Sequence, residues 1–221
     1  MPIIIDIISD VVCPWCYIGK CNLESALAKF HDSHPAEPAP TVRWHPFQLN
    51  PQLPKTGVPR AEYLEKKFGG PARAKQIYAR VTEAGKQAGI AFDFDRISVQ
   101  PNTVDAHRLI YRALDVNRQD AVVDALFRGY FLEGKDLTKL ESLVEAAEQA
   151  GIDGKASLDY LTGDDDLELI ADADREARAM GVEGVPFFII NRKYALSGAQ
   201  PPEVILQAIE QATAESAKTA S

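Results

Sequence analysis

Cysteine is scarce in this chain of 221 residues, with three in all. Three cysteines are too few for a disulfide-rich scaffold, and lasting structural disulfides are uncommon in reducing compartments. Two of the three, Cys13 and Cys16, are separated by only two residues. The scarcity therefore favours a catalytic or metal-binding pair over a structural cross-link.

Features that would indicate a membrane or nucleic-acid function are also lacking. No run approaches the roughly 20 apolar residues that a membrane-spanning helix requires. The start of the chain has no basic segment, and Asp6 interrupts its apolar run, so we expect no secretory signal and a cytoplasmic location. The net charge of -8 argues against nucleic acid or an anionic membrane as a partner.

The composition is that of a globular protein, with 46% hydrophobic and 25% charged residues. Its hydrophobic patterns predict strands near both ends of the chain and helices between them. The predicted strands cover residues 3–9, 41–47, 185–190 and 194–198. The predicted helices cover residues 14–30, 60–68, 71–88, 102–116, 118–132, 138–150, 155–162, 165–180 and 201–212.

The separated strands indicate how the chain is organised. A sheet of two strands alone is marginally stable, so we expect the strands from both ends to form one mixed sheet. The fold class is then α/β, with residues 1–53 and 181–214 forming one domain. Residues 54–180 form a helical insertion in it, and residues 215–221 form a polar tail.

The segment Cys13-Pro14-Trp15-Cys16 lies between the first predicted strand and the first helix. A helix N-terminus carries a positive partial charge that favours a thiolate, the reactive form of cysteine. In this setting the motif indicates thiol–disulfide exchange. Trp15 either influences access to the thiols or covers apolar surface near them. A zinc site remains an alternative, although the sequence holds no second C-x-x-C or H-x-x-x-H to complete four ligands.

Further candidates have a structural and a functional interpretation. Asn102 fits the N-cap of a helix, and His107 is either a structural histidine or a proton carrier near the thiols. The backbone N–H groups of Gly198, Ala199 and Gln200 either cap the last helix or bind a carboxylate. Cys21 lies five residues beyond Cys16, off its helix face, and is expected to be a small buried apolar side chain.

Five segments together resemble the DsbA-like thioredoxin-fold oxidoreductases, and in particular their FrnE-type subgroup. They are SDVVCPWCYIG at 9–19, WHPFQL at 44–49, NTVDAHR at 102–108, GVP at 184–186 and SGAQPP at 197–202. The resemblance covers nearly the whole chain. It implies a thioredoxin fold with a helical insertion, and a dithiol in which Cys13 attacks and Cys16 resolves the mixed disulfide.

The resemblance also implies a substrate site. X–Pro bonds are mostly trans in proteins, but the family implies a cis bond at Pro186, packed beside the dithiol. The backbone of Val185 would then bind an extended peptide or glutathione, and residues 198–200 would contact the γ-glutamyl end of glutathione. The expected partner is a disulfide- or thiol-containing protein or peptide, or glutathione as co-substrate. No bound cofactor or metal is expected. A homodimer is possible, and the sequence does not decide it.

Two other functions compete with disulfide exchange. The related 2-hydroxychromene-2-carboxylate isomerases and kappa-class glutathione transferases share the inserted architecture and use glutathione. They typically carry serine at the position of Cys13 and need no resolving cysteine, so the Cys13 and Cys16 pair favours exchange. The third candidate is a zinc- or partner-binding module.

Overall fold

A computed structural model describes residues 3–219 of the chain. Four strands form one mixed sheet in the order β2-β1-β5-β6. They are β1 (Ile4–Ser9), β2 (Thr41–Pro46), β5 (Phe187–Ile190) and β6 (Tyr194–Ser197). β1 runs parallel to β2 and antiparallel to β5, and β5 pairs antiparallel with β6. Strands from both ends of the chain therefore meet in a single sheet, as predicted.

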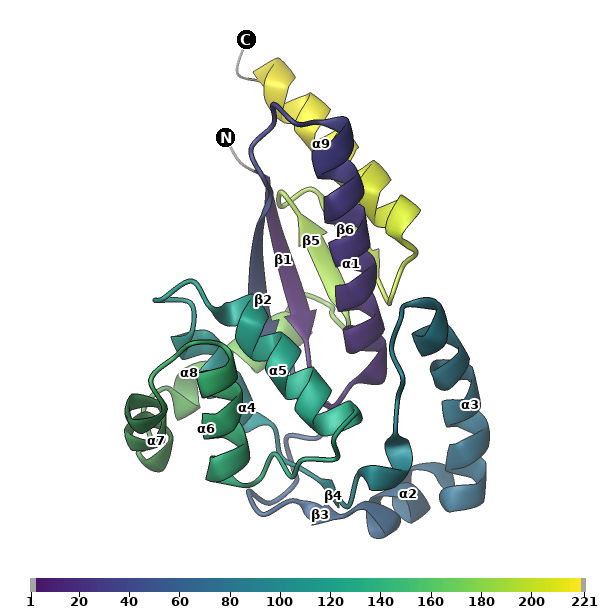
Figure 1. Ribbon diagram of the computed structural model, residues 1–221, viewed down its shortest axis with the longest axis vertical. Coiled ribbons are helices and arrows are strands. Elements are labelled where there is room, and N and C mark those ends of the chain that lie inside the picture. Colours follow the sequence, from purple (N-terminus) through teal and green to yellow (C-terminus); the bar gives the residue numbers. More distant parts are fainter. Residues whose placement is uncertain (1–2, 220–221) are drawn as a thin grey trace.

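Helices cover both faces of this sheet because its central strand is apolar on both sides. Ile5 and Ile7 of β1 are fully buried in the large core, beneath α1 (Pro14–Ser33) and α9 (Pro202–Thr219). Those two helices lie side by side along the sheet (Figure 1). Ile8 points to the opposite face, where it packs with Ala177 of α8. This alternation is the two-residue period of a strand.

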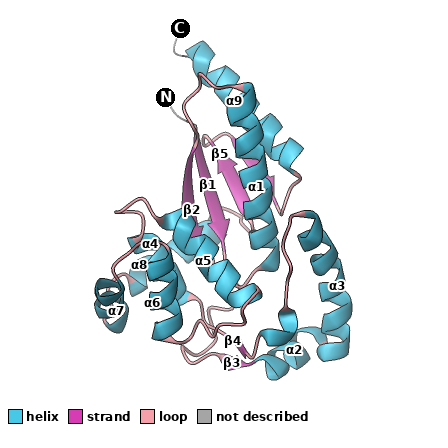
Figure 2. Ribbon diagram, viewed as in Figure 1, coloured by secondary structure: helices cyan, strands magenta, loops and turns pink. Residues whose placement is uncertain are grey.

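The chain between β2 and β5 is mostly helical, as the sequence predicted (Figure 2). Its helices are α2 (Arg60–Phe68), α3 (Pro71–Gln87), α4 (Val104–Arg112), α5 (Gln119–Phe131), α6 (Leu140–Gln149), α7 (Gly154–Thr162) and α8 (Leu167–Ala179). A 3-10 turn, η1 (Phe94–Arg96), precedes α4. Within residues 3–219, no helix is both long and apolar enough to cross a membrane.

Several boundaries differ from the prediction; the helix expected at 102–116, for example, spans Val104–Arg112. Two short strands, β3 (Val58–Pro59) and β4 (Val99–Gln100), pair antiparallel although both stretches were expected to be irregular. Two residues are too few for a strand period to be visible in a sequence. The strand expected from 185 begins at Phe187, after the turn at Pro186.

The last helix extends past its expected end at 212 and continues to Thr219. Residues 215–219 of the expected polar tail therefore belong to a helix, while residues 220–221 lie outside the described part. Contacts with the sheet edge explain the extension. Tyr194 donates its hydroxyl proton to Glu215 at 2.5 Å, and Asn191 donates to Ser216 at 3.1 Å.

One apolar core connects the sheet, α1 and the helical segment. The ring of Tyr17 on α1 stacks on Phe127 of α5, with 5.0 Å between centroids, and meets the edge of Phe92 at 6.0 Å. Lys20, whose side chain is 2% exposed, bridges α1 to Asp120 and Asp124 of α5 at 3.7 and 3.4 Å. The domain boundaries at 53/54 and 180/181 stay a prediction, since the core runs across them.

Candidate active site

The first turn of α1 carries the two cysteines. Cys13 is the N-cap residue of α1 and Pro14 is the first helical residue, where its missing N–H costs no intrahelical bond. The Cys13 amide donates to the Asp10 carbonyl at 3.0 Å, and the Cys16 amide donates to the Cys13 carbonyl at 3.0 Å. These bonds fix both cysteines at the positive end of the helix dipole.

The second part of the site comes from the far end of the chain. The Val185–Pro186 peptide bond is cis, as the resemblance implied. The Cys13 thiol donates to the Val185 carbonyl oxygen, with 3.4 Å between sulfur and oxygen. Residues 172 positions apart in the sequence are thereby in direct contact.

Gly19 allows α1 to approach Pro186 closely. A Cβ atom at residue 19 would lie 2.9 Å from Cγ of Pro186 and 3.2 Å from Cζ of Phe188. Real Cβ atoms do not approach a neighbour as closely as the first distance. A side chain at this position would therefore push Pro186 away from the helix that carries the dithiol.

Cys16 is a buried thiol whose surroundings change its pKa. Cys16 is 1% exposed and Cys13 is 4% exposed, and both are free thiols. Burial raises the pKa of Cys16 well above its usual value, and the neighbouring Cys13 raises it further. The Ser9 hydroxyl and the Asp10 amide lower it by a smaller amount through hydrogen bonds to the Cys16 sulfur. In the reduced protein Cys16 is therefore a protonated thiol at neutral pH.

Trp15 and Cys21 have different surroundings. Trp15, between the two cysteines, is 40% exposed, so it offers an aromatic surface to solvent next to the dithiol. Cys21 is half-buried, and burial raises its pKa to about 11. Its carboxylate neighbour Glu24 raises the pKa as well. Cys21 is thus a protonated thiol at neutral pH.

His107 lies beside a buried carboxylate that the sequence analysis did not select. The Nε2 atom of His107, which is 3% exposed, is 3.4 Å from Oδ1 of Asp10, which is 1% exposed. Neither atom has a hydrogen-bond partner, whereas Oδ2 of Asp10 accepts from the Leu49 amide at 2.7 Å. The Asp10 backbone amide also acts on the pKa of the Cys16 thiol, so Asp10 lies close to Cys16.

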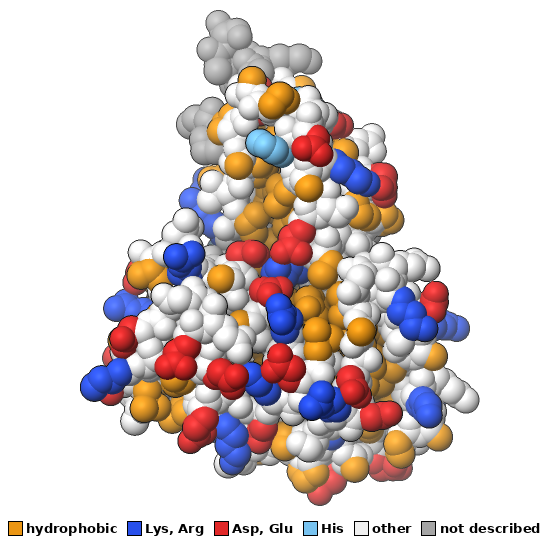
Figure 3. All heavy atoms as spheres, in the orientation of Figure 1, with side chains coloured by type: hydrophobic (Ala, Val, Ile, Leu, Met, Phe, Trp, Pro, Cys, Tyr) orange, Lys and Arg blue, Asp and Glu red, His pale blue; other side chains and the backbone are white. Residues whose placement is uncertain are grey.

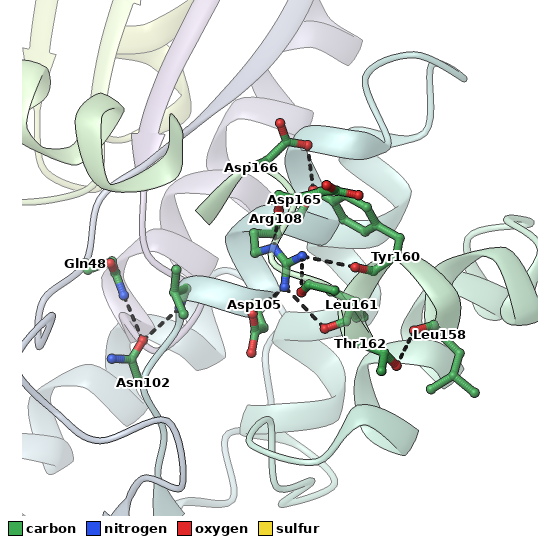
Figure 4. A network of polar contacts seen from close by, with 12 residues as sticks. Gln48, Asn102, Asp105, Arg108, Leu158, Tyr160, Leu161, Thr162, Asp165 and Asp166 are labelled. Carbon is green, nitrogen blue, oxygen red and sulfur yellow. Dashed lines mark hydrogen bonds and ion pairs between the residues drawn. The ribbon is translucent and has the colours of Figure 1, made fainter. Parts of the chain in front are cut away.

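Asn102 connects the loop after β2 to the start of α4. Its Oδ1 accepts from the Val104 amide and from the Gln48 side chain, both at 3.0 Å (Figure 4). Its Nδ2 donates to the Leu53 carbonyl at 2.7 Å. The N-cap position itself is held by Thr103. The N-cap is therefore one residue later than expected, and Asn102 caps α4 from the residue before it.

The segment before α9 uses most of its backbone donors internally. The Gly198 amide donates to the Pro186 carbonyl at 2.8 Å, and the Gln200 amide donates to the Gly198 carbonyl at 2.9 Å. The Gln200 carbonyl accepts from Asn22 of α1 at 2.9 Å. Of the residues 198–200, this leaves the Ala199 amide as the donor to offer a ligand. The bond from the Gly198 amide places this segment against Pro186.

Asp10 and Gly19 are the positions next to the dithiol that sequence reasoning did not select. Both lie within the segment 9–19 that carries the resemblance, and Asp10 stands in a largely apolar stretch, which is a weak signal of a buried carboxylate. The need for glycine at 19 depends on contact with Pro186, which the sequence does not reveal. Among the described residues, no three His, Cys, Asp or Glu side chains gather as metal ligands would.

Comparisons with known proteins identify the family of this chain. The sequence profile of the DsbA-like thioredoxin domain matches residues 4–210. The chain is 34% identical to a probable DsbA oxidoreductase, SCO1869, from Streptomyces coelicolor. That match covers 96% of this chain and 91% of that chain, and the structures superpose with a TM-score of 0.84.

Two further similarities are more distant. The protein YwbO of Bacillus subtilis is 27% identical over 217 residues, which cover 95% of this chain and 96% of YwbO. The cytosolic disulfide reductase DsbM from Pseudomonas aeruginosa, solved with glutathione, is 17% identical, with a TM-score of 0.65 over 94% of this chain and 98% of that one. The DsbM similarity concerns the fold alone. The profile match, together with the dithiol on α1 and the cis bond before Pro186, shows that the chain belongs to the DsbA-like thioredoxin domain family.

Proposed function

We propose that this protein is a thiol–disulfide oxidoreductase or isomerase that works through Cys13 and Cys16. The observation that carries the proposal is the contact of the Cys13 thiol with the Val185 carbonyl, beside Pro186. An extended chain bound along this backbone would present its sulfur to Cys13. Cys16, buried behind it, is held as the second thiol of the pair.

The reaction requires two exchange steps. The Cys13 thiolate attacks one sulfur of a substrate disulfide, forms a mixed disulfide and releases the other sulfur as a thiolate. Cys16 then loses its proton and attacks the Cys13 sulfur, which releases the second substrate thiol and leaves a Cys13–Cys16 disulfide. The substrate gains two electrons and the protein loses two. In isomerisation the substrate's own thiol displaces Cys13 instead.

The raised pKa of Cys16 makes its proton the main obstacle in the second step. A proton acceptor near the sulfur would remove it. The Asp10 backbone acts on the pKa of Cys16, and the Asp10 carboxylate lies 3.4 Å from His107 Nε2, with no hydrogen bond to either atom of that contact in the described part of the chain. We assign the role of proton acceptor to His107. We assign substrate binding to Trp15, Val185, Pro186 and residues 198–200. Asn102 is assigned an indirect part, since it fixes the start of the helix that bears His107.

The proposed substrate is a protein, a peptide or glutathione with an accessible disulfide or thiol. Glutathione is proposed as co-substrate, and the structure of DsbM with glutathione makes it the natural first candidate. We propose a cytoplasmic location, where the glutathione poise would favour reduction or isomerisation over net oxidation. A homodimer is compatible with this scheme and is not required by it.

A redox assay on four proteins tests the proposal. Wild type, Cys13→Ser, Cys16→Ser and Cys21→Ser are compared in reduction of insulin and in reactivation of a protein with scrambled disulfides. We expect Cys13→Ser to lose both activities and Cys16→Ser to lose reduction, with Cys21→Ser as the matched control that keeps both. Full activity in Cys13→Ser would show that the dithiol is not the reacting group.

The same variants separate exchange from the glutathione-dependent isomerase or transferase alternative. That chemistry needs no resolving cysteine, so Cys16→Ser would keep its full activity towards a small electrophile with glutathione. Under the dithiol scheme, Cys16→Ser and Cys13→Ser both lose the activity of disulfide reduction. Stoichiometric zinc in freshly purified reduced protein would favour the metal-binding alternative.

A further inference from the structure

A buried arginine with no carboxylate partner lies at the start of α2. Arg60 is 8% exposed. In the described part of the chain, no carboxylate oxygen lies within 4.0 Å of the Arg60 guanidinium. The arginines that do have such a partner are Arg108, Arg112, Arg175 and Arg178. Its Nη1 donates to Oε1 of Gln100, and its Nη2 donates to the Tyr78 hydroxyl at 2.6 Å.

These neighbours do not neutralise the charge. A buried ionised group is costly unless an opposite charge compensates it. Arg60 has neutral acceptors and the ring faces of Tyr63 and Tyr78, at 5.4 and 5.5 Å. A guanidinium has five N–H donors, and two of them are used here. Three donors and one positive charge are therefore available to a ligand.

Arg60 lines a cavity of about 600 Å³ between α2, α3 and η1. Leu64, Phe92 and Phe94 give it apolar walls, and its lining also includes charges of both signs. Of its acidic residues, Glu83 pairs with Lys86 at 3.7 Å, while Asp93 and Asp95 lie more than 4.0 Å from Arg60. In Figure 3 an apolar strip is exposed between the regions of α5 and α3. The cavity thus suits a ligand with an apolar arm and an acidic group.

A row of aromatic rings connects this cavity to the helix that carries the dithiol. Tyr78 stacks on Phe94 with 4.4 Å between ring centroids, and Phe94 stacks on Phe92 at 5.0 Å. Phe92 meets Tyr17, the residue after Cys16 on α1, at 6.0 Å. Arg60 donates to the Tyr78 hydroxyl at the far end of this row, and the charge of Cys13 adds to the rise that burial causes in the pKa of Tyr78.

We propose that Arg60 binds a carboxylate of the molecule whose sulfur reacts with Cys13. This inference rests on the proposed disulfide exchange and adds a substrate class to it. The substrate is a small thiol or disulfide that carries a carboxylate on a flexible apolar arm. The carboxylate forms a two-point contact with the guanidinium, a geometry that arginine supplies and lysine does not.

A matched pair of disulfides tests the proposal on the unmodified protein. Dithiodibutyrate and its dimethyl ester share the same disulfide and the same arm, and they differ in charge. Reduced wild type is mixed with each, and the loss of protein thiols is followed over a range of concentrations. We expect the acid to half-saturate the protein at an about tenfold lower concentration or less, the effect of one charge-assisted contact. Equal values for acid and ester would overturn the proposal.

Two variants locate the effect. Arg60→Gln should lose the preference for the acid while it reacts with the ester as wild type does. Arg73→Gln is the matched control, because Arg73 is exposed on α3 and outside the cavity lining, and it should keep the preference. A preference that survives in Arg60→Gln, or disappears in Arg73→Gln, would contradict the assignment.

A binding measurement separates this inference from the proposed function. Sebacate is the carbon isostere of dithiodibutyrate and cannot exchange. In an NMR titration it should shift wild-type resonances around Tyr78 and Phe92, and it should not shift them in Arg60→Gln. Reaction with both disulfides at equal affinity and no sebacate shifts would refute the arginine site alone. Sebacate shifts with no reaction of either disulfide would refute the exchange function and leave the arginine site standing.

Discussion

At the scale of single residues, the burial of Cys16 has a consequence for stability. Burial raises the pKa of Cys16 well above 9, whereas the thiol of an unfolded chain ionises near that value. Above pH 9 the folded protein therefore retains a proton that the unfolded chain has lost. The free energy of unfolding must then fall as pH rises, by up to about 1.4 kcal/mol per pH unit for this one group.

We predict that Cys16→Ala weakens this alkaline dependence. The free energy of unfolding is measured in urea with a reductant present, between pH 7 and 10.5, for wild type and variant. Wild type should lose stability more steeply above pH 9, although the variant starts from a lower value because of its missing sulfur. Cys21 and Tyr17, whose pKa values are about 11 and 12, are common to both proteins. Parallel curves would show that Cys16 titrates normally.

Gly19 gives a second prediction at this scale. Gly19→Ala brings a methyl group to 2.9 Å from Pro186, and overpacking of this kind costs about 1–3 kcal/mol. Alanine has a higher helix propensity than glycine, which offsets up to about 1 kcal/mol of this loss in the free energy of unfolding. We expect a net loss of about 1 kcal/mol and slower disulfide exchange. Gly184→Ala is the control, because nothing lies within 4 Å of its added atom, and a larger loss in the control would contradict the packing argument.

The position of the dithiol at the start of α1 and the cis bond before Pro186 were predictable from the sequence, and their surroundings were less so. Cys13, Cys16 and Pro186 stand in short local motifs that are typical of thioredoxin-fold oxidoreductases. Asp10 and Arg60 matter because of what lies around them after folding, and a charged residue in a sequence normally indicates solvent. Burial without a partner is a property of the assembled structure.

At the scale of elements, α4 positions His107 and is itself held by Arg108. Arg108 is fully buried and donates to the carbonyls of Tyr160, Leu161, Gly163 and Asp165, at 3.0, 3.3, 2.8 and 2.7 Å (Figure 4). The last carbonyls of a helix have no intrahelical partner, and α7 ends at Thr162. Arg108 thus caps α7 from a neighbouring helix and also pairs with Asp105 at 2.8 Å.

We predict that Arg108→Met lowers the free energy of unfolding by about 3 kcal/mol or more, since it leaves buried acceptors without donors. Arg112→Met, one turn later on the same helix, removes an exposed arginine paired with Asp115 and should change stability by less than about 1 kcal/mol. Urea denaturation of both variants checks this. Similar losses would show that the capping bonds contribute little.

Helix positions were predictable because each amphipathic stretch carries its own period and its own stop signals. Gly69, Gly134 and Gly181 follow predicted helices and have φ values of 75, 71 and 88°, which glycine adopts readily. The strand pair β3–β4 was not predictable from two residues each. The capping of α7 by Arg108 was equally hidden, since 52 or more residues separate the donor from its acceptors.

At the scale of the whole molecule, the shared core predicts a single cooperative unfolding transition. Trp15 and Trp44 report on α1 and the sheet, whereas far-UV circular dichroism reports mainly on the helices between β2 and β5. The contacts of Tyr17 and Lys20 with α5 couple these two parts. Fluorescence and circular dichroism should therefore give the same urea midpoint. Separate midpoints would show that the helical insertion unfolds as an independent domain.

The overall architecture was predictable because the sheet needs strands from both ends of the chain. The sequence alone could not show how closely the inserted helices share the core. Tyr17 and Phe127 look like ordinary apolar positions of two separate helices until their rings are seen stacked at 5.0 Å. The packing of α2, α3 and η1 against one another creates the cavity around Arg60.

The direct test of the account is to capture the intermediate of the exchange. Reduced Cys16→Ser is mixed with glutathione disulfide, and the products are identified by mass spectrometry of the intact protein and its peptides. The account predicts one glutathione per chain, attached to Cys13, and its accumulation because no resolving thiol follows. Wild type should pass to an internal Cys13–Cys16 disulfide under the same conditions. Attachment to Cys21, or no adduct on Cys13, would contradict the assignment of Cys13 as the attacking thiol.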